Sequence, residues 1–144
     1  MAFTEDCTIN SLKANKGFIG MIKVLFETHH LYYLPNFLPI VSEFKNRGNY
    51  DIYFSMPQHI NQRERDLFSL ACMDLGLNTI DADDEELRIK KILNEKFSII
   101  LVANVGQITR IASDTTLTVM VYHGIGLKQS YYNDIDDRID IRSV

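Results

Sequence analysis

The clearest indication of the fold class is the segment Phe97-Ser-Ile-Ile-Leu-Val-Ala103, which is apolar at nearly every position. A strand with one face in water alternates polar and apolar residues, whereas a parallel strand covered by helices on both faces is apolar almost throughout. We therefore expect this segment to form a strand in the middle of a mainly parallel sheet.

Further strands and a first helix precede this segment, and one strand follows it. Strand character recurs at residues 20–26, 50–56, 77–80 and 117–122. After the first of these, helical spacing continues up to Arg47-Gly48, a helix stop. The apolar positions of this helix are Leu34, Phe37, Leu38, Val41 and Phe44. Pro35 and Pro39 are compatible with it because both can lie in or beside its first turn.

Two longer helices and a short one are expected after the second strand. Asn61 and Glu64 have capping-box spacing and begin a helix that Gly76 ends. Its expected inward residues are Leu67, Phe68, Leu70, Ala71 and Leu75. The next helix follows Asp83-Asp84-Glu85-Glu86 and has lysines towards its end, which suits the helix dipole. With a short helix near 107–112, the alternation predicts a Rossmann-like, doubly wound α/β domain with helices on both sheet faces.

The 144 residues suit one such domain. Residues 1–17 have weak periodicity and are expected to be an N-terminal arm, leaving 18–144 as the α/β domain. The final stretch Ile139-Asp-Ile-Arg-Ser-Val144 begins a new alternating segment that stops, so we expect the domain to be part of a longer two-domain protein.

Charge and cysteine content narrow the class of protein. The net charge is −4 and no segment forms a basic face, which argues against nucleic acid as a partner. The first twenty residues lack the apolar run of a signal peptide, and no later run is long enough to span a bilayer. Cys7 and Cys72 do not suggest a disulfide framework, so we expect a reduced, cytoplasmic protein.

Candidate chemistry lies where the predicted strands end, since open α/β sheets bind ligands beyond the carboxyl ends of their strands. This rule selects Glu27-Thr-His-His30, Asn104-Val-Gly106 and His123-Gly-Ile-Gly-Leu-Lys128, and it leaves His59 outside. Imidazole titrates near neutral pH and can take a proton from a hydroxyl. In the third segment, Gly124 and Gly126 allow backbone N–H groups to approach a ligand, and Lys128 suits phosphate.

Each of these features also has a purely structural explanation. A histidine at a strand end is often a tolerated polar terminus, and His29 and His30, as sequence neighbours, are expected to point different ways. A Gly-x-Gly after a strand is often a tight turn, and a single lysine is usually solvated. Four tyrosines could line a pocket or simply pack in part: Tyr32, Tyr33, Tyr131 and Tyr132. The functional interpretation rests on the combination of His123, the two glycines and Lys128 in one loop.

Neither a metal nor a cofactor is expected. Asp81-Ala82-Asp83 resembles the paired-aspartate metal site of some glycosyltransferases, but it directly precedes an acidic first helical turn, so capping explains it. The Gly124-Ile-Gly126 stretch lacks the third glycine and the first-strand position of a dinucleotide-binding motif. Glu27-Thr-His-His30 lacks the acidic pair with which a phosphate-receiver domain binds magnesium.

The segment His123-Gly-Ile-Gly-Leu-Lys128 resembles the His-Gly-Thr-Pro-Leu-Lys motif of the CDP-glycerol glycerophosphotransferase family, the teichoic-acid-type polymerases and primases of bacterial cell walls. Ile125 and Gly126 replace the threonine and proline of that motif. Residues 24–48 are similar to the opening strand, loop and helix of GT-B enzymes, including the non-hydrolysing UDP-sugar 2-epimerases. The likeness covers about residues 20–142.

The resemblance implies that the chain is the amino-terminal, acceptor-side domain of a GT-B transferase. His123 would be the base that activates an acceptor hydroxyl, which attacks the β-phosphate of CDP-glycerol and releases CMP. Lys128 would hold acceptor or phosphate charge. Gly124, Gly126, His29 and His30 are further candidates for substrate binding because they lie beyond the ends of predicted strands. The acceptor would be a hydroxyl or polyol phosphate, with the full-length enzyme at the inner face of the membrane.

The family binds its nucleotide-activated glycerol or sugar donor mainly in a carboxyl-terminal domain, so we expect this chain to be inactive alone. Two alternatives stay open at this point. The chain could be a non-catalytic, flavodoxin-like ligand-binding or signalling domain, or a UDP-sugar 2-epimerase-like domain.

Overall fold

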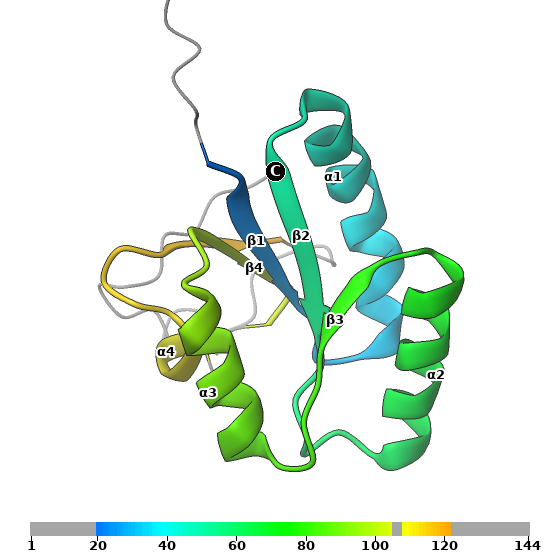
Figure 1. Ribbon diagram of the computed structural model, residues 1–144. Coiled ribbons are helices and arrows are strands. Elements are labelled where there is room, and N and C mark those ends of the chain that lie inside the picture. The colour runs from blue at the N-terminus through cyan, green and yellow to red at the C-terminus, as the bar shows by residue number, and fades with distance from the viewer. Residues whose placement is uncertain (1–19, 105–107, 122–144) are drawn as a thin grey trace, which may run out of the picture.

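Parallel strands in the order β3-β2-β1-β4-β5 form the central sheet (Figure 1). Our computed structural model describes residues 20–104 and 108–121. The strands in this part of the chain are β1 (Ile22–Glu27), β2 (Tyr50–Ser55), β3 (Asn78–Ile80), β4 (Ile99–Val102) and β5 (Leu117–Met120). All four strand pairings are parallel, which confirms the predicted Rossmann-like α/β class.

The strand order separates this domain from the flavodoxin-like alternative. A flavodoxin-like sheet has the order 2-1-3-4-5, whereas a Rossmann sheet begins 3-2-1-4-5, as this one does. The flavodoxin-like topology is therefore wrong for this chain. The direction of winding reverses between β1 and β4, and this switch point is where open α/β sheets usually bind ligands.

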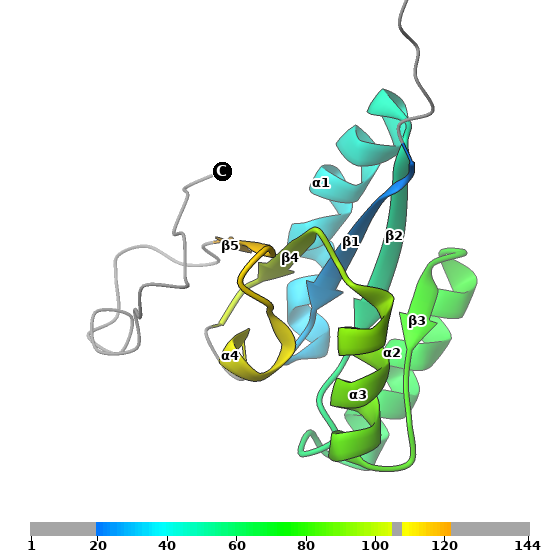
Figure 2. The same cartoon turned by 60° about the vertical axis from the view of Figure 1, so that its left-hand side comes forward.

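Helices cover both faces of the sheet (Figure 2). One core lies between the sheet and two helices, α1 (Leu34–Arg47) and α2 (Gln62–Asp74). A 3-10 turn, η1 (Leu31–Tyr33), directly precedes α1 in the chain. The other lies between the sheet and α3 (Glu85–Glu95) and α4 (Ile108–Ile111). Alternate residues of β1 divide between the cores: Val24 and Phe26 join the first, and Leu25 the second.

β1, not β4, is the middle strand, so that part of the prediction is wrong. β4 is an inner strand, as its apolar sequence indicates, but it lies one place from the middle, between β1 and β5. β1 is fully buried from Val24 to Glu27. Its sequence is less uniformly apolar because Lys23 lies near the start of the strand, where its ammonium pairs with Glu95.

Helix α1 ends as predicted but contains one proline deeper than expected. Gly48 is the C-cap, with a φ of 70°, a conformation that favours glycine. Pro35 lies in the first turn, where its missing N–H is not needed. Pro39, however, lies inside the helix, so the Pro35 carbonyl four residues earlier has no N–H donor from that position.

Helix α2 begins and ends as predicted but buries a narrower face. The Asn61 side chain accepts a hydrogen bond from the Glu64 backbone N–H at 2.9 Å, which confirms the cap. The buried residues are Phe68 and Cys72. Three expected inward leucines are instead exposed: Leu67, Leu70 and Leu75. The prediction failed because α2 contacts the short edge strand β3, where a narrow apolar face suffices.

An aspartate of the acidic segment caps α3, but it is Asp84 rather than Asp81 or Asp83. Asp84 is the N-cap, and its carboxylate accepts a hydrogen bond from the Leu87 N–H at 2.7 Å. The inward face of α3 carries Arg88, Ile89 and Ile92. It therefore places one charged side chain against the sheet.

Candidate functional site

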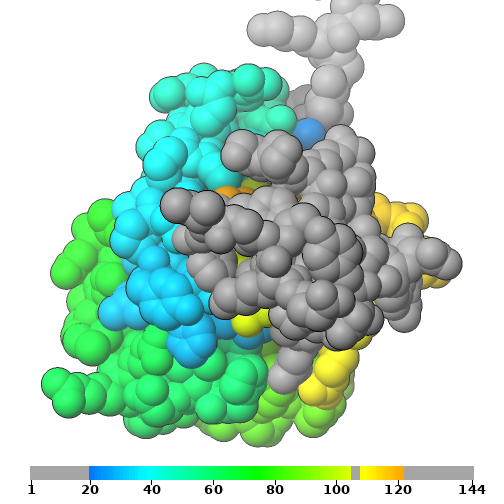
Figure 3. All heavy atoms as spheres, turned by 180° about the vertical axis from the view of Figure 1, so that it is seen from behind, coloured from blue at the N-terminus to red at the C-terminus, as the bar shows by residue number. Residues whose placement is uncertain are grey.

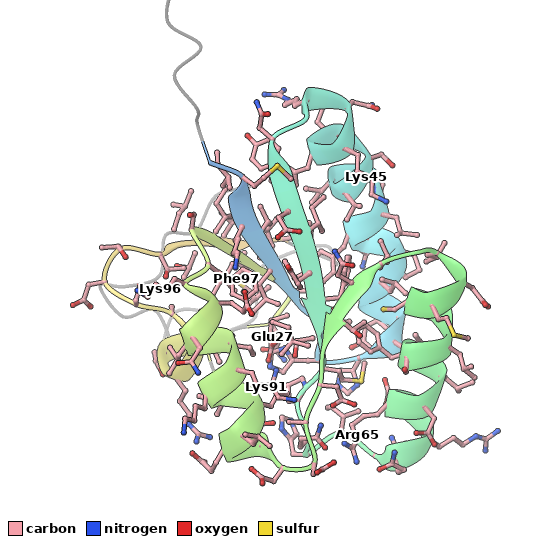
Figure 4. All side chains as sticks on the ribbon, in the orientation of Figure 1. Glu27, Lys45, Arg65, Lys91, Lys96 and Phe97 are labelled. Carbon is pink, nitrogen blue, oxygen red and sulfur yellow. The ribbon has the colours of Figure 1, made fainter. Side chains whose placement is uncertain are left out.

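The carboxyl ends of the strands meet at one edge of the sheet, and polar side chains gather there. Glu27 ends β1 and lies in register with Ser55 of β2 on one side and Val102 of β4 on the other. Both Glu27 and Ser55 are fully buried. Glu27 lies between the sheet and α3 (Figure 4).

Arg88 of α3 connects these two strand ends. Its guanidinium donates to both oxygens of Glu27 at 3.0 Å and to the Ser55 hydroxyl at 2.8 Å. It also donates to Glu85 at 2.7 and 2.9 Å. These contacts use all five guanidinium N–H groups, so the buried cation leaves no polar hydrogen unpaired. Ser55 in turn donates to the Ile80 carbonyl at 2.8 Å, which joins the end of β3 to the cluster.

Two carboxylates share the single Arg88 charge. Burial raises the pKa of Glu27, and Arg88 only partly offsets this effect because it also pairs with Glu85. Burial also acts to raise the pKa of Glu85, but hydrogen bonds from Arg88 and the Gln58 amide bring it below its ordinary value. The carboxylates also raise the pKa of Arg88 above its ordinary value despite burial. The cluster is thus rich in negative charge around a permanently charged guanidinium.

His29, two residues beyond Glu27, is the unusual side chain of this edge. It is 4% exposed, and neither Nδ1 nor Nε2 has a hydrogen-bond partner within the described part of the chain. Burial, followed by the charges of His59 and Arg88, lowers its pKa to about 4. The ring is therefore neutral at physiological pH. Because buried polar groups in proteins are nearly always hydrogen-bonded, we expect the His29 imidazole to form hydrogen bonds with a further group.

His30 points in a different direction from His29, as expected for sequence neighbours. Its Nδ1 lies 3.3 Å from a Glu64 oxygen that also accepts the Leu31 N–H at 2.9 Å. Its ring stacks on Tyr32 with the centroids 5.2 Å apart. Tyr33 is buried beside them and accepts a hydrogen bond from the Tyr32 hydroxyl. His30 thus belongs to an aromatic group between β1 and α2, apart from the Arg88 cluster.

The structure adds residues that the sequence patterns did not identify. His59 was expected to lie outside the site, yet its ring centroid is 6.4 Å from that of His29. Arg88 was not identified either, although one signal was available, namely an arginine on the apolar face of a helix three residues after a glutamate. Outside the described residues lie the predicted site members His123, Gly124, Gly126 and Lys128, with Tyr131 and Tyr132. Of the 104–106 segment, only Asn104 is described.

Neither of the paired aspartates is the N-cap of α3, which is Asp84. Asp81 Oδ1 accepts hydrogen bonds from the Gln58 side chain at 2.7 Å and from the Ala82 N–H at 2.9 Å. Within residues 20–104 and 108–121, no group of three or more His, Cys, Asp or Glu side chains is arranged to hold a metal ion.

No helix within residues 20–104 and 108–121 is both long and apolar enough to cross a bilayer. Cys72 is buried as a free thiol, and Cys7 lies outside the residues that the structure describes.

Comparison with known proteins gives no relative for this chain. No protein-family model matches it, and searches of curated proteins and of solved structures find no match either. The residues at the carboxyl edge of the sheet are therefore the basis for a proposed function.

Proposed function

We propose that this chain forms the acceptor side of a transferase that moves a glycerophosphate or glycosyl group from a nucleotide-activated donor, such as CDP-glycerol, to a hydroxyl acceptor. The observation that carries the proposal is His29. It is a buried, neutral imidazole just beyond the carboxyl end of the middle strand, and neither of its nitrogens has a hydrogen-bond partner among residues 20–104 and 108–121.

A neutral imidazole suits a hydroxyl ligand. One ring nitrogen donates a hydrogen bond and the other accepts one, and an alcohol group can do both in return. Because the pKa of His29 is lowered to about 4, the ring keeps both capacities throughout the physiological pH range. His29 also follows β1 at the switch point of the sheet, where α/β domains bind their ligands. His30, half exposed and stacked on Tyr32, would line the rim of the acceptor site.

The proposed catalytic base is His123, which follows β5 by three residues in the sequence. β5 is parallel to β1 and two places from it, so the two strand ends are roughly 10 Å apart. In the proposed reaction His123 takes the proton of the acceptor hydroxyl, whose oxygen attacks the β-phosphorus of CDP-glycerol. The bond from that phosphorus to the bridging oxygen breaks and CMP leaves, while Lys128 compensates phosphate charge.

Ligand binding to the chain itself tests the proposal. We expect short oligomers of glycerol phosphate to bind in a calorimetric titration, and CDP-glycerol to bind far more weakly, with no release of CMP. His29→Phe should weaken oligomer binding roughly tenfold or more, the loss of one or two hydrogen bonds. Lys45→Ala, at the opposite end of the sheet, is the control and should bind as the wild type does.

Two outcomes would overturn the proposal. One is a chain that binds neither polyol phosphates nor sugars at millimolar concentration while remaining folded. The other is tight binding of CDP-glycerol that His29→Phe does not change, which would indicate a nucleotide-binding module instead. When the chain is supplied with a donor-binding domain, His123→Ala should abolish CMP release and leave oligomer binding intact.

A further inference from the structure

Helix α2 presents a stripe of four residues to solvent on the side away from the sheet. Arg63, Leu67, Leu70 and Asp74 follow one another at intervals of four, three and four residues, which places them on one helix face. Leu67 is 46% exposed and Leu70 is 52% exposed. The neighbouring Met73 is 68% exposed and widens the apolar area. We call Arg63, Leu67, Leu70 and Asp74 the α2 stripe.

The α2 stripe lies on the outer flank of the molecule. The residues that attach α2 to the sheet, Phe68 and Cys72, are on the opposite side of the helix. Figure 3 shows α2 (green) forming the left border of the molecule in that view. Exposed leucines in the middle of a helix face are a feature of interaction surfaces.

The two ends of the α2 stripe carry opposite charges. Arg63 lies in the first turn and Asp74 is the last residue of the helix, and both are exposed. Neither has a hydrogen bond or an ion pair in the described part of the chain. The sequence along the stripe is therefore positive, apolar, apolar, negative.

We propose that a second copy of this chain docks on the α2 stripe, with the two helices antiparallel about a twofold axis between Leu67 and Leu70. This arrangement places Leu67 of each copy opposite Leu70 of the other. It also places Arg63 opposite Asp74 at both ends. The intervals of four, three and four are the a/d spacing of helices that pack along a common seam.

A second copy fits better than an unrelated partner because the α2 stripe is complementary to itself. A twofold contact uses the same surface on both subunits, so each residue must suit the one at its mirrored position. Reversing the stripe exchanges its charges and keeps its leucines, which meets this condition. A parallel pairing would instead set Arg63 against Arg63 and Asp74 against Asp74.

The expected dimer is weak. The helix has 13 residues and is about 20 Å long, so two such faces bury an area at the low end of specific interfaces. We expect a dissociation constant on the order of micromolar rather than nanomolar. The surface lies on a helix flank, so this inference is independent of the proposed acceptor site.

Sedimentation velocity over a range of protein concentrations tests the inference. The wild type should show a reversible monomer–dimer equilibrium. Arg63→Asp and Asp74→Arg should each weaken it roughly tenfold, because each sets like charges opposite one another at both ends of the seam. The double variant carrying both changes should recover wild-type affinity, since the pairs are restored with reversed sign.

The leucines provide the second arm of the test. Leu70→Glu should abolish the dimer, whereas Leu87→Glu, at a comparably exposed leucine of α3, should leave it unchanged. Far-UV circular dichroism checks that each variant is folded. A wild type that stays monomeric at high concentration would overturn the inference, and so would a double charge reversal that fails to restore the dimer.

Discussion

Arg88 donates one hydrogen bond to each carboxylate oxygen of Glu27, which lies 61 residues earlier in the chain, and both side chains are fully buried. The pair links α3 to the end of the middle strand. Since α3 is the crossover between β3 and β4, the contact fixes the helix at the point where the direction of winding reverses. His29 follows Glu27 by two residues, so the same contact holds the start of the candidate acceptor loop.

Replacing Arg88 by methionine should destabilise the domain strongly. The substitution leaves Glu27 buried without its cation, and breaking a buried ion pair in this way costs about 3–5 kcal/mol. Urea unfolding followed by circular dichroism at pH 7 measures the loss. The matched control is Lys23→Met, which breaks the half-exposed pair with Glu95 and should change stability far less.

The double variant Glu27→Gln with Arg88→Met separates charge from packing. Removing both charges should recover part of the lost stability, because no uncompensated carboxylate remains buried. An Arg88→Met protein as stable as the wild type would mean that water reaches Glu27 in solution, contrary to its complete burial here.

Acid should destabilise the domain through His29. The imidazole has a pKa of about 4 in the folded protein and 6.5 in the unfolded chain, so below pH 6.5 the unfolded state binds the proton more readily. Stability should therefore be unaffected by this group above pH 6.5, fall as the pH decreases towards 4, and level off below it. The full loss is roughly 3 kcal/mol.

Comparison with His29→Gln isolates this effect from other titrating groups. The difference in unfolding free energy between wild type and variant, measured from pH 8 to pH 4, should show the decrease described above. Glu27 is present in both proteins, so its contribution to the pH dependence largely cancels in this difference. If the difference does not vary with pH, or if the His29 ring titrates near pH 6.5 in NMR spectra, the ring is solvated or paired.

Local sequence signals predicted the elements of this fold well, but not the contacts between them. The cap at Asn61, the stop at Gly48 and the apolar β4 all depend on neighbouring residues, and all were predicted. The central position of β1 and the exposure of Leu67 depend on which strand lies beside which, and strand order is not encoded in local periodicity.

The same distinction applies to the candidate site. The rule that ligands bind at strand ends identified His29 and His30 from sequence. It could not identify Arg88, which reaches the edge from the first turns of a helix, or the approach of His59 to His29. These depend on how α3 and the loop after β2 fold back over the sheet.

The Cys72 thiol should react only when the protein opens. It is fully buried, and burial raises its pKa to about 12, so little thiolate forms at pH 8. In a Cys7→Ser background, a thiol reagent such as DTNB should label folded protein very slowly and urea-unfolded protein at once. Labelling of the folded protein as fast as a free thiol would contradict the burial of the inner face of α2.

Asp84 should be the aspartate of the acidic segment that stabilises α3. Its carboxylate accepts the Leu87 N–H at 2.7 Å, so Asp84→Ala removes an N-cap and should cost about 1 kcal/mol. Asp83→Ala is the matched control, because Asp83 is exposed and is not the cap. The stability of this variant should match that of the wild type. Thermal unfolding of the three proteins in parallel makes the comparison. Equal losses from the two substitutions would indicate that the general negative charge before the helix, rather than the hydrogen bond of the cap, stabilises it.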